Sequence, residues 1–203
     1  MFSNLRDNLF VLMQYLLPQH PISRLIHWLT RLRIQWLKNI MGRWFIGHFQ
    51  VNMSEAIEED IRAYPTFNSF FTRALKPGAR PLATEANAVL CPVDGAVSQA
   101  GNIDGDAIFQ AKGHRFSLNT LLGDSAAWAE KFQNGLFTTL YLSPRDYHRI
   151  HMPLTGTLQE VIHVPGRLFS VNPVTVSKVP GLFARNERVA CLFDTEHLSL
   201  IHI

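Results

Sequence analysis

The spacing of apolar residues changes near residue 87, and this change limits the fold more than any other feature of the sequence. Before that point, apolar residues recur in steps of three and four from Ile22 to Trp44, which is the spacing of one face of an α-helix. After it, short runs typical of β-strands alternate with Gly, Pro, Asp and Asn. These runs are residues 88–93, 95–100, 106–111, 136–142, 157–164 and 188–193. The pattern predicts an α+β fold, with a helical amino-terminal arm followed by a mostly antiparallel β body.

The sequence divides into three segments: a basic apolar arm (1–50), a connecting segment (51–86) and the β-rich segment (87–203). In the second, we predict a short helix over 54–64 that is capped by Ser54. The segment 64–82 follows it, and Phe67, Phe70 and Phe71 are expected to anchor this segment to the body. In the third, residues 117–132 have helical character, with Ser117 and Asp124 as candidate caps.

The first 50 residues are both basic and apolar. Six Lys and Arg residues oppose a single acidic residue, Asp7, so that this segment carries +5 whereas the whole chain carries +3. Segments that bind nucleic acid are usually far more polar than this one, which contains Trp28, Trp36 and Trp44. Basic residues on one side of a helix and Trp, Phe and Leu on the other are typical of helices in a membrane interface. We therefore expect the arm to meet an anionic membrane surface and not nucleic acid.

The arm is expected to lie on a membrane without crossing it. No uncharged apolar run reaches the roughly 18 residues needed to span a bilayer, and the apolar stretch 9–17 ends at Pro18. No small-residue cleavage site follows this stretch, which argues against a secretory signal. We predict two amphipathic helices joined near Pro18–Pro21; the side chains that fall away from the apolar stripe are Arg24, His27, Arg31, Gln35 and Lys38. The alternative is a helical pair packed on the chain's own domain.

The two cysteines, Cys91 and Cys191, are too few for a disulfide scaffold or a four-cysteine zinc site. With 203 residues, of which 47% are hydrophobic, the chain can build a core without such supports. We expect each cysteine to be a small buried side chain in a reducing compartment.

The densest group of chemically active side chains lies in residues 143–153. It brings together His148, His151, two arginines, a carboxylate and a phenol. Because histidine titrates near neutral pH, we expect at least one of the two to act as a general acid or base. Residues three apart share a face on a helix but not on a strand, so a turn must separate them if both serve one pocket. The alternatives are half of a metal site, for which no third ligand is evident nearby, and a purely structural role.

The second candidate for chemistry is Asp94, in the sequence Cys-Pro-Val-Asp-Gly that begins at Cys91. Asp-Gly between two β runs is the ordinary signature of a hairpin turn. In a functional role, the Asp94 carboxylate would orient an imidazole and stabilise its protonated form while that imidazole activates a serine hydroxyl.

Six blocks of this sequence, in this order, resemble bacterial phosphatidylserine decarboxylases. The blocks cover nearly the whole chain up to Glu196, and those at 141–153 and 182–196 are long and specific. They are residues 64–81, 91–99, 110–118, 141–153, 164–173 and 182–196.

The resemblance implies a pyruvoyl-dependent lyase that decarboxylates phosphatidylserine to phosphatidylethanolamine. Such an enzyme is made as a proenzyme and cleaves itself at a Gly-Ser bond in an LGST-like motif, which converts the serine into a pyruvoyl group. Asp94 and His151 match the family's Asp and His that activate this serine. His148 matches a histidine that is expected to assist decarboxylation by proton transfer. The pyruvoyl group would form a Schiff base with the amine of phosphatidylserine and accept electrons as CO₂ leaves.

The sequence departs from the family pattern at its carboxyl end. None of its 12 glycines is followed by serine, and residues 197–203 do not look like the family's continuation. We therefore expect an incomplete proenzyme that is inactive by itself. The serine that forms the pyruvoyl group, and the small subunit that carries it, are then absent from these 203 residues.

The resemblance also implies a peripheral location on the cytoplasmic side of the bacterial inner membrane, and it leaves open a homo-oligomer. Two other functions remain as alternatives. One is a non-catalytic module that binds a membrane surface through residues 1–50. The other is a metal-dependent hydrolase that uses His148 and His151, although we expect no metal site.

Overall fold

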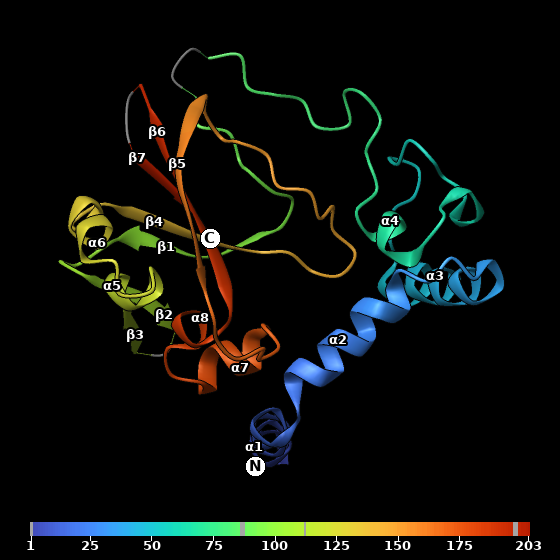
Figure 1. Cartoon of the computed structure of the whole chain (residues 1–203), viewed down its shortest axis with the longest axis horizontal. Helices are drawn as coiled ribbons and strands as arrows, with labels where there is room; N and C mark the ends of the chain where they lie inside the picture. Colours follow the sequence, from blue (N-terminus) through green and yellow to red (C-terminus); the bar gives the residue numbers. More distant parts are fainter. Residues whose placement is uncertain (1, 86–87, 112, 197–198) are drawn as a thin grey trace. The chain divides into compact units, whose positions relative to one another are not determined.

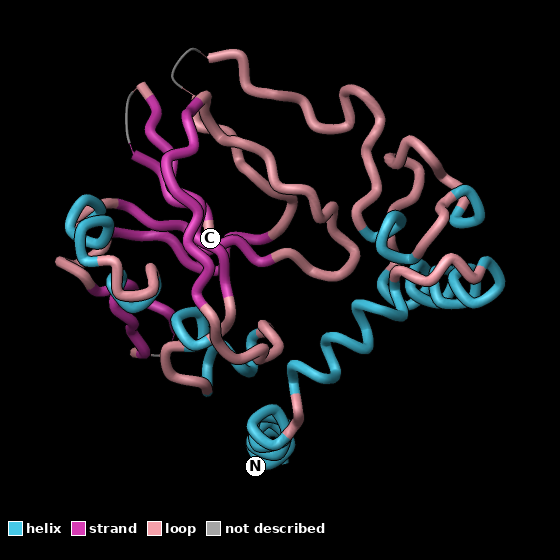
Figure 2. The backbone as a smooth tube through the Cα atoms, viewed as in Figure 1, coloured by secondary structure: helices cyan, strands magenta, loops and turns pink. Residues whose placement is uncertain are grey.

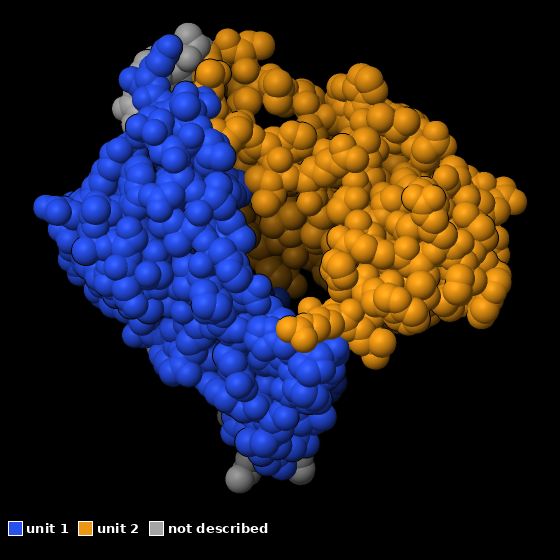
Figure 3. Space-filling model, viewed as in Figure 1, with its two compact units in different colours: residues 1–22, 98–139, 156–203 blue, residues 23–97, 140–155 orange. Residues whose placement is uncertain are grey.

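The computed structural model describes residues 2–85, 88–111, 113–196 and 199–203. The chain forms two compact units, each made of segments that are distant in the sequence (Figure 3). Unit 1 contains residues 1–22, 98–139 and 156–203, and unit 2 contains residues 23–97 and 140–155.

Three helices, and not two, make up the first 50 residues (Figure 1). They are α1 (Phe2–Leu16), α2 (Gln19–Thr30) and α3 (Gln35–Phe49). The expected junction near Pro18–Pro21 is present, since α1 ends at Leu16 and Pro21 lies in the first turn of α2, where a missing N–H is tolerated. The continuous helix expected from Ile22 to Trp44 is wrong, because the chain leaves helical geometry at residues 31–34.

Packing within unit 2 explains why α3 is separate from α2. Lys38, expected on a polar helix face, is buried, and its Nζ donates to the carbonyl of Ile61 at 2.6 Å. Gly42 lies on the same face, where a Cβ atom would come within 2.5 Å of the Ile61 side chain. These contacts with a distant part of the chain fix the direction of α3 independently of α2.

The core of unit 2 is aromatic. Phe70 is fully buried on α4 (Phe67–Phe71), so this segment is an anchor as predicted, but its phenylalanines pack mainly on α3 of the arm and not on the β body. Its ring and that of Phe67 meet Phe45 of α3 edge-on, at centroid distances of 6.0 and 5.3 Å. Thr66 caps α4 by accepting from the Ser69 backbone N–H.

The helix expected over residues 54–64 is wrong. Only Ile61–Ala63 forms one short 3₁₀ turn, η1, and its cap is Asp60 instead of Ser54. The backbone of 55–57 pairs with 74–76: the Ile57 N–H donates to the Ala74 carbonyl at 3.0 Å. This long-range pairing takes the backbone groups that a helix would need.

Most of the strand residues lie in unit 1, together with α1 and several short helices (Figure 2). A three-stranded antiparallel sheet has the order β5 (Gly156–Val164), β6 (Arg188–Thr195) and β7 (Ser199–His202). Two further pairs are β1 (Ala96–Asn102) with β4 (Leu136–Tyr141) and, antiparallel, β2 (Ala107–Ala111) with β3 (His114–Ser117).

Short helices complete unit 1. They are α5 (Leu118–Leu121), α6 (Ala126–Phe132), α7 (Pro173–Lys178) and α8 (Leu182–Arg185). Ser117 caps α5 as expected, accepting from the Thr120 N–H at 3.3 Å. The position before α6 is Ser125 and not Asp124, which has a left-handed φ of 63°.

The core of unit 1 collects side chains from several elements: Ile103, Ile108, Leu118, Leu121, Leu122, Ala129 and Ala190. Helix α1 is held beside α7 by a smaller cluster, in which Val11 packs with Phe169, Val179 and Leu182. The ring of Tyr15 meets that of Phe169 at 4.8 Å.

Helices at the amino terminus followed by antiparallel sheets confirm the predicted α+β class. Five of the six β runs contain a strand, but 88–93 does not, and the segment boundary expected at 86–87 lies outside the described residues. Both cysteines are free, and the burial predicted for each is wrong, because Cys91 is exposed and Cys191 is only half-buried. Among the described residues, no helix has both the length and the apolar character needed to cross a bilayer.

Candidate active site

All three candidate catalytic residues lie in unit 2, on two segments that run side by side. Residues 88–97 carry Asp94, and residues 140–155 carry His148 and His151. The His151 N–H donates to the Pro92 carbonyl at 2.8 Å, and the Leu90 N–H donates to the Pro153 carbonyl at 3.1 Å. These two bonds take the place of the strand that the sequence predicted over 88–93, and they bring Asp94 and His151 onto neighbouring stretches of backbone.

A glycine is required beside Asp94. A Cβ atom at Gly95 would lie 2.5 Å from the carbonyl oxygen of Tyr141, and the φ of Gly95 is 155°. Glycine at position 95 thus allows the backbone beside Asp94 to pass close to the backbone at Tyr141. No side chain could occupy position 95 without moving one of them.

A reverse turn separates the two histidines from β4. The Asp146 N–H donates to the Ser143 carbonyl at 2.9 Å, and the Ser143 N–H donates back to the Asp146 carboxylate at 2.6 Å. An aspartate that binds backbone N–H groups in its own turn is a common stabiliser of such loops.

Each histidine has a defined partner. Nε2 of His151 lies 2.9 Å from the hydroxyl of Tyr147, and Nδ1 of His148 lies 2.8 Å from the carbonyl oxygen of Asp146. Because a carbonyl only accepts, Nδ1 of His148 carries the hydrogen, and in the neutral ring Nε2 then holds the lone pair. The His148 ring also contacts Phe71, at a centroid distance of 4.2 Å.

The carboxylate of Asp94 is bound by an arginine. Nε of Arg80 donates to both oxygens of Asp94, at 2.9 and 3.0 Å, while Nη2 of Arg80 donates to Glu55 at 2.8 Å. Hydrogen bonds to Asp94 and Glu55 raise the pKa of the Arg80 guanidinium. Asp94 and Glu55 therefore share one cation.

Unit 2 contains a cavity of about 260 Å³ whose lining includes Asp94 and the partners of the two histidines, but neither histidine. Asp94 lines it, and so does Tyr147, the partner of His151. Asp146, whose carbonyl binds His148, lines it as well. The Asp94 carboxylate accepts hydrogen bonds from Arg80, and the His151 ring bonds to Tyr147. The structure therefore shows no direct hydrogen bond between the side chains of Asp94 and His151. The lining residues of the cavity are Gln50, Asn52, Glu55, Arg73, Leu75, Arg80, Asp94, Arg145, Asp146 and Tyr147.

Sequence reasoning missed Arg80, Glu55 and Arg73. The sequence predicts a turn around Arg80 and a helix around Glu55. The contact of Arg80 with Asp94 and Glu55 forms only in the folded chain. Arg73 had a detectable signal, because a lone charge in the aromatic segment 67–75 suggests a buried cation. Within the described residues, no cluster of three or more His, Cys, Asp or Glu side chains forms a metal site.

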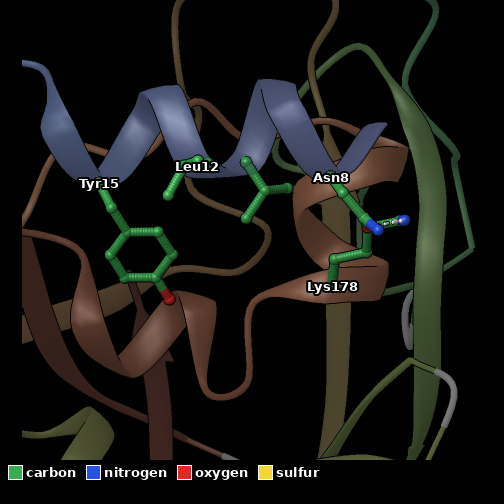
Figure 4. A pocket seen from close by; sticks show the side chains of 5 residues that line it. Asn8, Leu12, Tyr15 and Lys178 are labelled. Atoms are coloured by element: carbon green, nitrogen blue, oxygen red, sulfur yellow. Dashed lines mark hydrogen bonds between the residues drawn. The ribbon is translucent and has the colours of Figure 1, made fainter. Parts of the chain in front are cut away.

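A second cavity, of about 400 Å³, lies in unit 1 and contains none of the candidate residues. Asn8, Val11, Leu12 and Tyr15 of α1 line it together with Lys178 of α7. Figure 4 shows Lys178 reaching Asn8, to which its Nζ donates at 2.6 Å. This cavity lies where α1 packs against α7 and contains none of the groups proposed for catalysis.

Comparison with known proteins identifies the family. The family model "Phosphatidylserine decarboxylase" matches residues 67–203, and a second model, named "PSD", matches residues 9–50. Curated relatives named "Phosphatidylserine decarboxylase proenzyme" include one from Alkalilimnicola ehrlichii, 60% identical over 190 residues that cover 94% of this chain and 66% of the relative. Another, from Bordetella pertussis, is 61% identical over 192 residues, 95% of this chain and 65% of the relative.

The chain thus spans about two thirds of the length of the curated relatives it matches. A relative from Pseudomonas putida strain F1 shows the same relation, with 60% identity over 95% of this chain and 67% of its own length. The match includes both segments that carry the candidate residues. The chain belongs to the phosphatidylserine decarboxylase family.

Proposed function

We propose that this chain is the larger part of a phosphatidylserine decarboxylase proenzyme, a lyase that converts phosphatidylserine to phosphatidylethanolamine. Family membership supports this proposal. The observation that carries it further is the cavity of unit 2, which Asp94 lines together with the tyrosine that binds His151. Asp94 lines the cavity directly, and the His151 imidazole is connected to it through Tyr147. An acid and an imidazole are the groups that activation of a serine hydroxyl requires.

In this proposal His151 removes the proton from the serine hydroxyl during self-cleavage, and Asp94 stabilises the imidazolium that results. Tyr147 orients the His151 ring through its hydroxyl group. Arg80 holds the Asp94 carboxylate in place, because its Nε donates to both carboxylate oxygens.

His148 has a different role in this proposal, that of moving a proton during decarboxylation. Its Nδ1–H is directed at the Asp146 carbonyl, so Nε2 is the nitrogen that takes up or gives back the proton. Its contact with Phe71 holds the ring on one side.

The residues present fit a pyruvoyl enzyme in part. Asp94 and His151 would activate the serine from which the pyruvoyl group forms. No Gly-Ser pair occurs in these 203 residues, so that serine would come from polypeptide outside them. When present, the pyruvoyl group supplies a covalently bound carbonyl that draws electrons from the substrate as CO₂ leaves.

The helices of the arm support a peripheral location on an anionic membrane, which we assign to the cytoplasmic face of the bacterial inner membrane. On α3, Trp36, Ile40 and Trp44 repeat every four residues and are 67, 61 and 61% exposed. Helix α2 has no buried residue, and its Trp28 is 59% exposed. Exposed aromatic and aliphatic side chains on basic helices suit the interface between head groups and acyl chains.

The test joins this chain, in natural order, to the part of the A. ehrlichii relative that its match does not cover. We expect the joined protein to cleave itself and to release CO₂ from phosphatidylserine, and we expect the 203-residue chain alone to do neither. Intact mass measures the cleavage, and labelled phosphatidylserine measures the CO₂.

Variants assign the roles. Asp94→Asn and His151→Ala should each slow cleavage strongly, whereas His148→Ala should cleave at the wild-type rate but release CO₂ slowly. His163→Ala, at an exposed position of β5, is the matched control and should leave both steps unchanged. A folded joined protein that neither cleaves nor releases CO₂ would overturn the proposal and favour a non-catalytic membrane-binding module.

A further inference from the structure

Arg73 is a buried cation that has no ion-pair partner among the residues the structure describes. It follows α4 and is only 3% exposed. Its Nη2 donates to the Arg145 carbonyl at 3.1 Å, and its guanidinium lies 5.8 Å from the centre of the Phe70 ring. Within the described part of the chain, Nε and Nη1 of Arg73 have no hydrogen-bond partner.

This arrangement is unusual for a buried arginine. Buried polar atoms are nearly always hydrogen-bonded, and buried charges are nearly always paired. The other two arginines that line the cavity are more exposed and nevertheless have acidic partners: Arg80 pairs with Glu55 and Asp94, and Arg145 lies 3.9 Å from a carboxylate oxygen of Asp146. Arg73 is the exception, and it lines the same cavity.

Burial lowers the pKa of the Arg73 guanidinium, and the nearby Tyr64, Glu55 and Asp94 oppose that shift. The cation persists, because arginine is not deprotonated in proteins under ordinary conditions. One residue of the cavity lining is therefore a charged donor, and two of its N–H-bearing nitrogens have no partner among the described residues.

The charges around the cavity suit a ligand that carries both signs. Three arginines and three acidic residues line it, so the lining has no formal net charge. The excess negative charge lies where Glu55 and Asp94 share Arg80, and the unmatched positive charge is Arg73. A volume of about 260 Å³ is below the roughly 300 Å³ of the smallest drug-sized pockets, which favours a head group over acyl chains.

We propose that this cavity binds a zwitterionic, amino-acid-like head group, with its carboxylate or phosphate oxygens on Arg73 and its ammonium group beside Asp94 and Glu55. The identification of this head group as that of phosphatidylserine rests on the proposed function; the chemistry that Arg73 recognises does not. A lipid head group and a free amino acid or phosphoamino acid share this chemistry, so the test must separate them.

The first test uses the full 203-residue chain and calorimetric titration with water-soluble compounds. The probes are glycerophospho-L-serine, glycerophosphoethanolamine, O-phospho-L-serine and L-serine. We expect glycerophosphoserine to bind at least about 10-fold more tightly than glycerophosphoethanolamine, which lacks the carboxylate, since a charge-assisted hydrogen bond accounts for a factor of this size. Tightest binding of free O-phosphoserine or serine would assign the cavity to a soluble ligand, and equal binding of all four probes would overturn the proposal.

Variants then assign the binding to Arg73. Arg73→Met should weaken glycerophosphoserine binding by about 10-fold to 100-fold, and Arg73→Lys should restore part of it. Arg62→Met is the matched control, because Arg62 lies in the same unit but is exposed and paired with Asp60. Unchanged affinity in a folded Arg73→Met protein would overturn the proposal.

A measurement on the wild-type chain covers the case in which Arg73 variants do not fold. The Nε–H signal of Arg73 in NMR spectra should shift as glycerophosphoserine is added, and that of Arg62 should not. Absence of any shift at saturating probe would also overturn the proposal.

These experiments need no self-cleavage, so binding through Arg73 without CO₂ release by the joined protein would refute only the proposed function. Decarboxylation that is indifferent to Arg73→Met would refute only this inference.

Discussion

The hydroxyl of Tyr147 lies 2.9 Å from Nε2 of His151, and the two rings stack with their centroids 5.5 Å apart. The two residues are one helical turn apart in number but lie in a loop, where no helix would align them. Tyr147 is buried and lines the cavity that Asp94 also lines. The pair therefore connects the proposed base to that cavity.

Tyr147→Phe should slow self-cleavage of the joined protein by about 2-fold to 10-fold, the effect of one neutral hydrogen bond. The phenylalanine keeps the ring stacking, so the stability of the chain should change little. The measurement is the cleavage rate of the joined protein at one fixed pH. A rate identical to that of the wild type would show that Tyr147 does not orient the histidine.

Gly95→Ala should destabilise the chain by about 1–3 kcal/mol, because the new Cβ atom would overlap the Tyr141 carbonyl. Gly47→Ala is the control: Gly47 lies within α3 with no atom near its missing side chain, so alanine should stabilise by about 0.5–1 kcal/mol. Urea unfolding measures both. Equal effects of the two substitutions would contradict the close approach of the segments beside Asp94.

Trp36→Glu combined with Trp44→Glu should weaken binding to anionic vesicles by at least about 10-fold, because two aromatic side chains would leave the interface. Leu136→Glu, at a position of β4 that is 81% exposed, should leave binding unchanged. Flotation of the full chain with vesicles at low and high salt is the measurement, and binding should weaken with salt. A full chain that does not bind at low salt would contradict the membrane role of the arm.

His202 should make stability depend on pH. Burial lowers its pKa below the ordinary value of 6.5. As the pH falls through about 6.5, the unfolded chain takes up a proton that the folded chain still resists, so the free energy of unfolding decreases until the folded pKa is reached. His202→Phe should reduce this loss between pH 7.5 and 5.5, and His27→Phe, at an exposed position, should not. Equal pH dependence in wild type and His202→Phe would contradict the assignment.

Elements whose stabilising contacts are local could be predicted from the sequence. Ser117 caps α5 within its own turn, and the runs 157–164 and 188–193 form strands, as their β-prone residues predict. Residues 54–64 have helical composition, but their backbone is paired with 74–76, and no local pattern indicates such pairing.

Some residues of the candidate site could likewise be predicted from the sequence, and others could not. The composition of residues 143–153 pointed to the segment that runs beside Asp94, because so many polar groups rarely occur together without a shared role. The bond from Arg80 to Asp94 spans 14 residues, and the orphaned nitrogens of Arg73 depend on burial by α4 and its surroundings. Both are consequences of tertiary packing, which spacing along the chain does not encode.

The most direct test of the account is a double-mutant cycle on self-cleavage of the joined protein, using Asp94→Asn, His151→Gln and both together. If the two residues act as a unit on the serine hydroxyl, the double variant should cleave no more slowly than the slower single variant. Effects on the rate that multiply, or cleavage of Asp94→Asn at the wild-type rate, would contradict the claim that Asp94 and His151 work together.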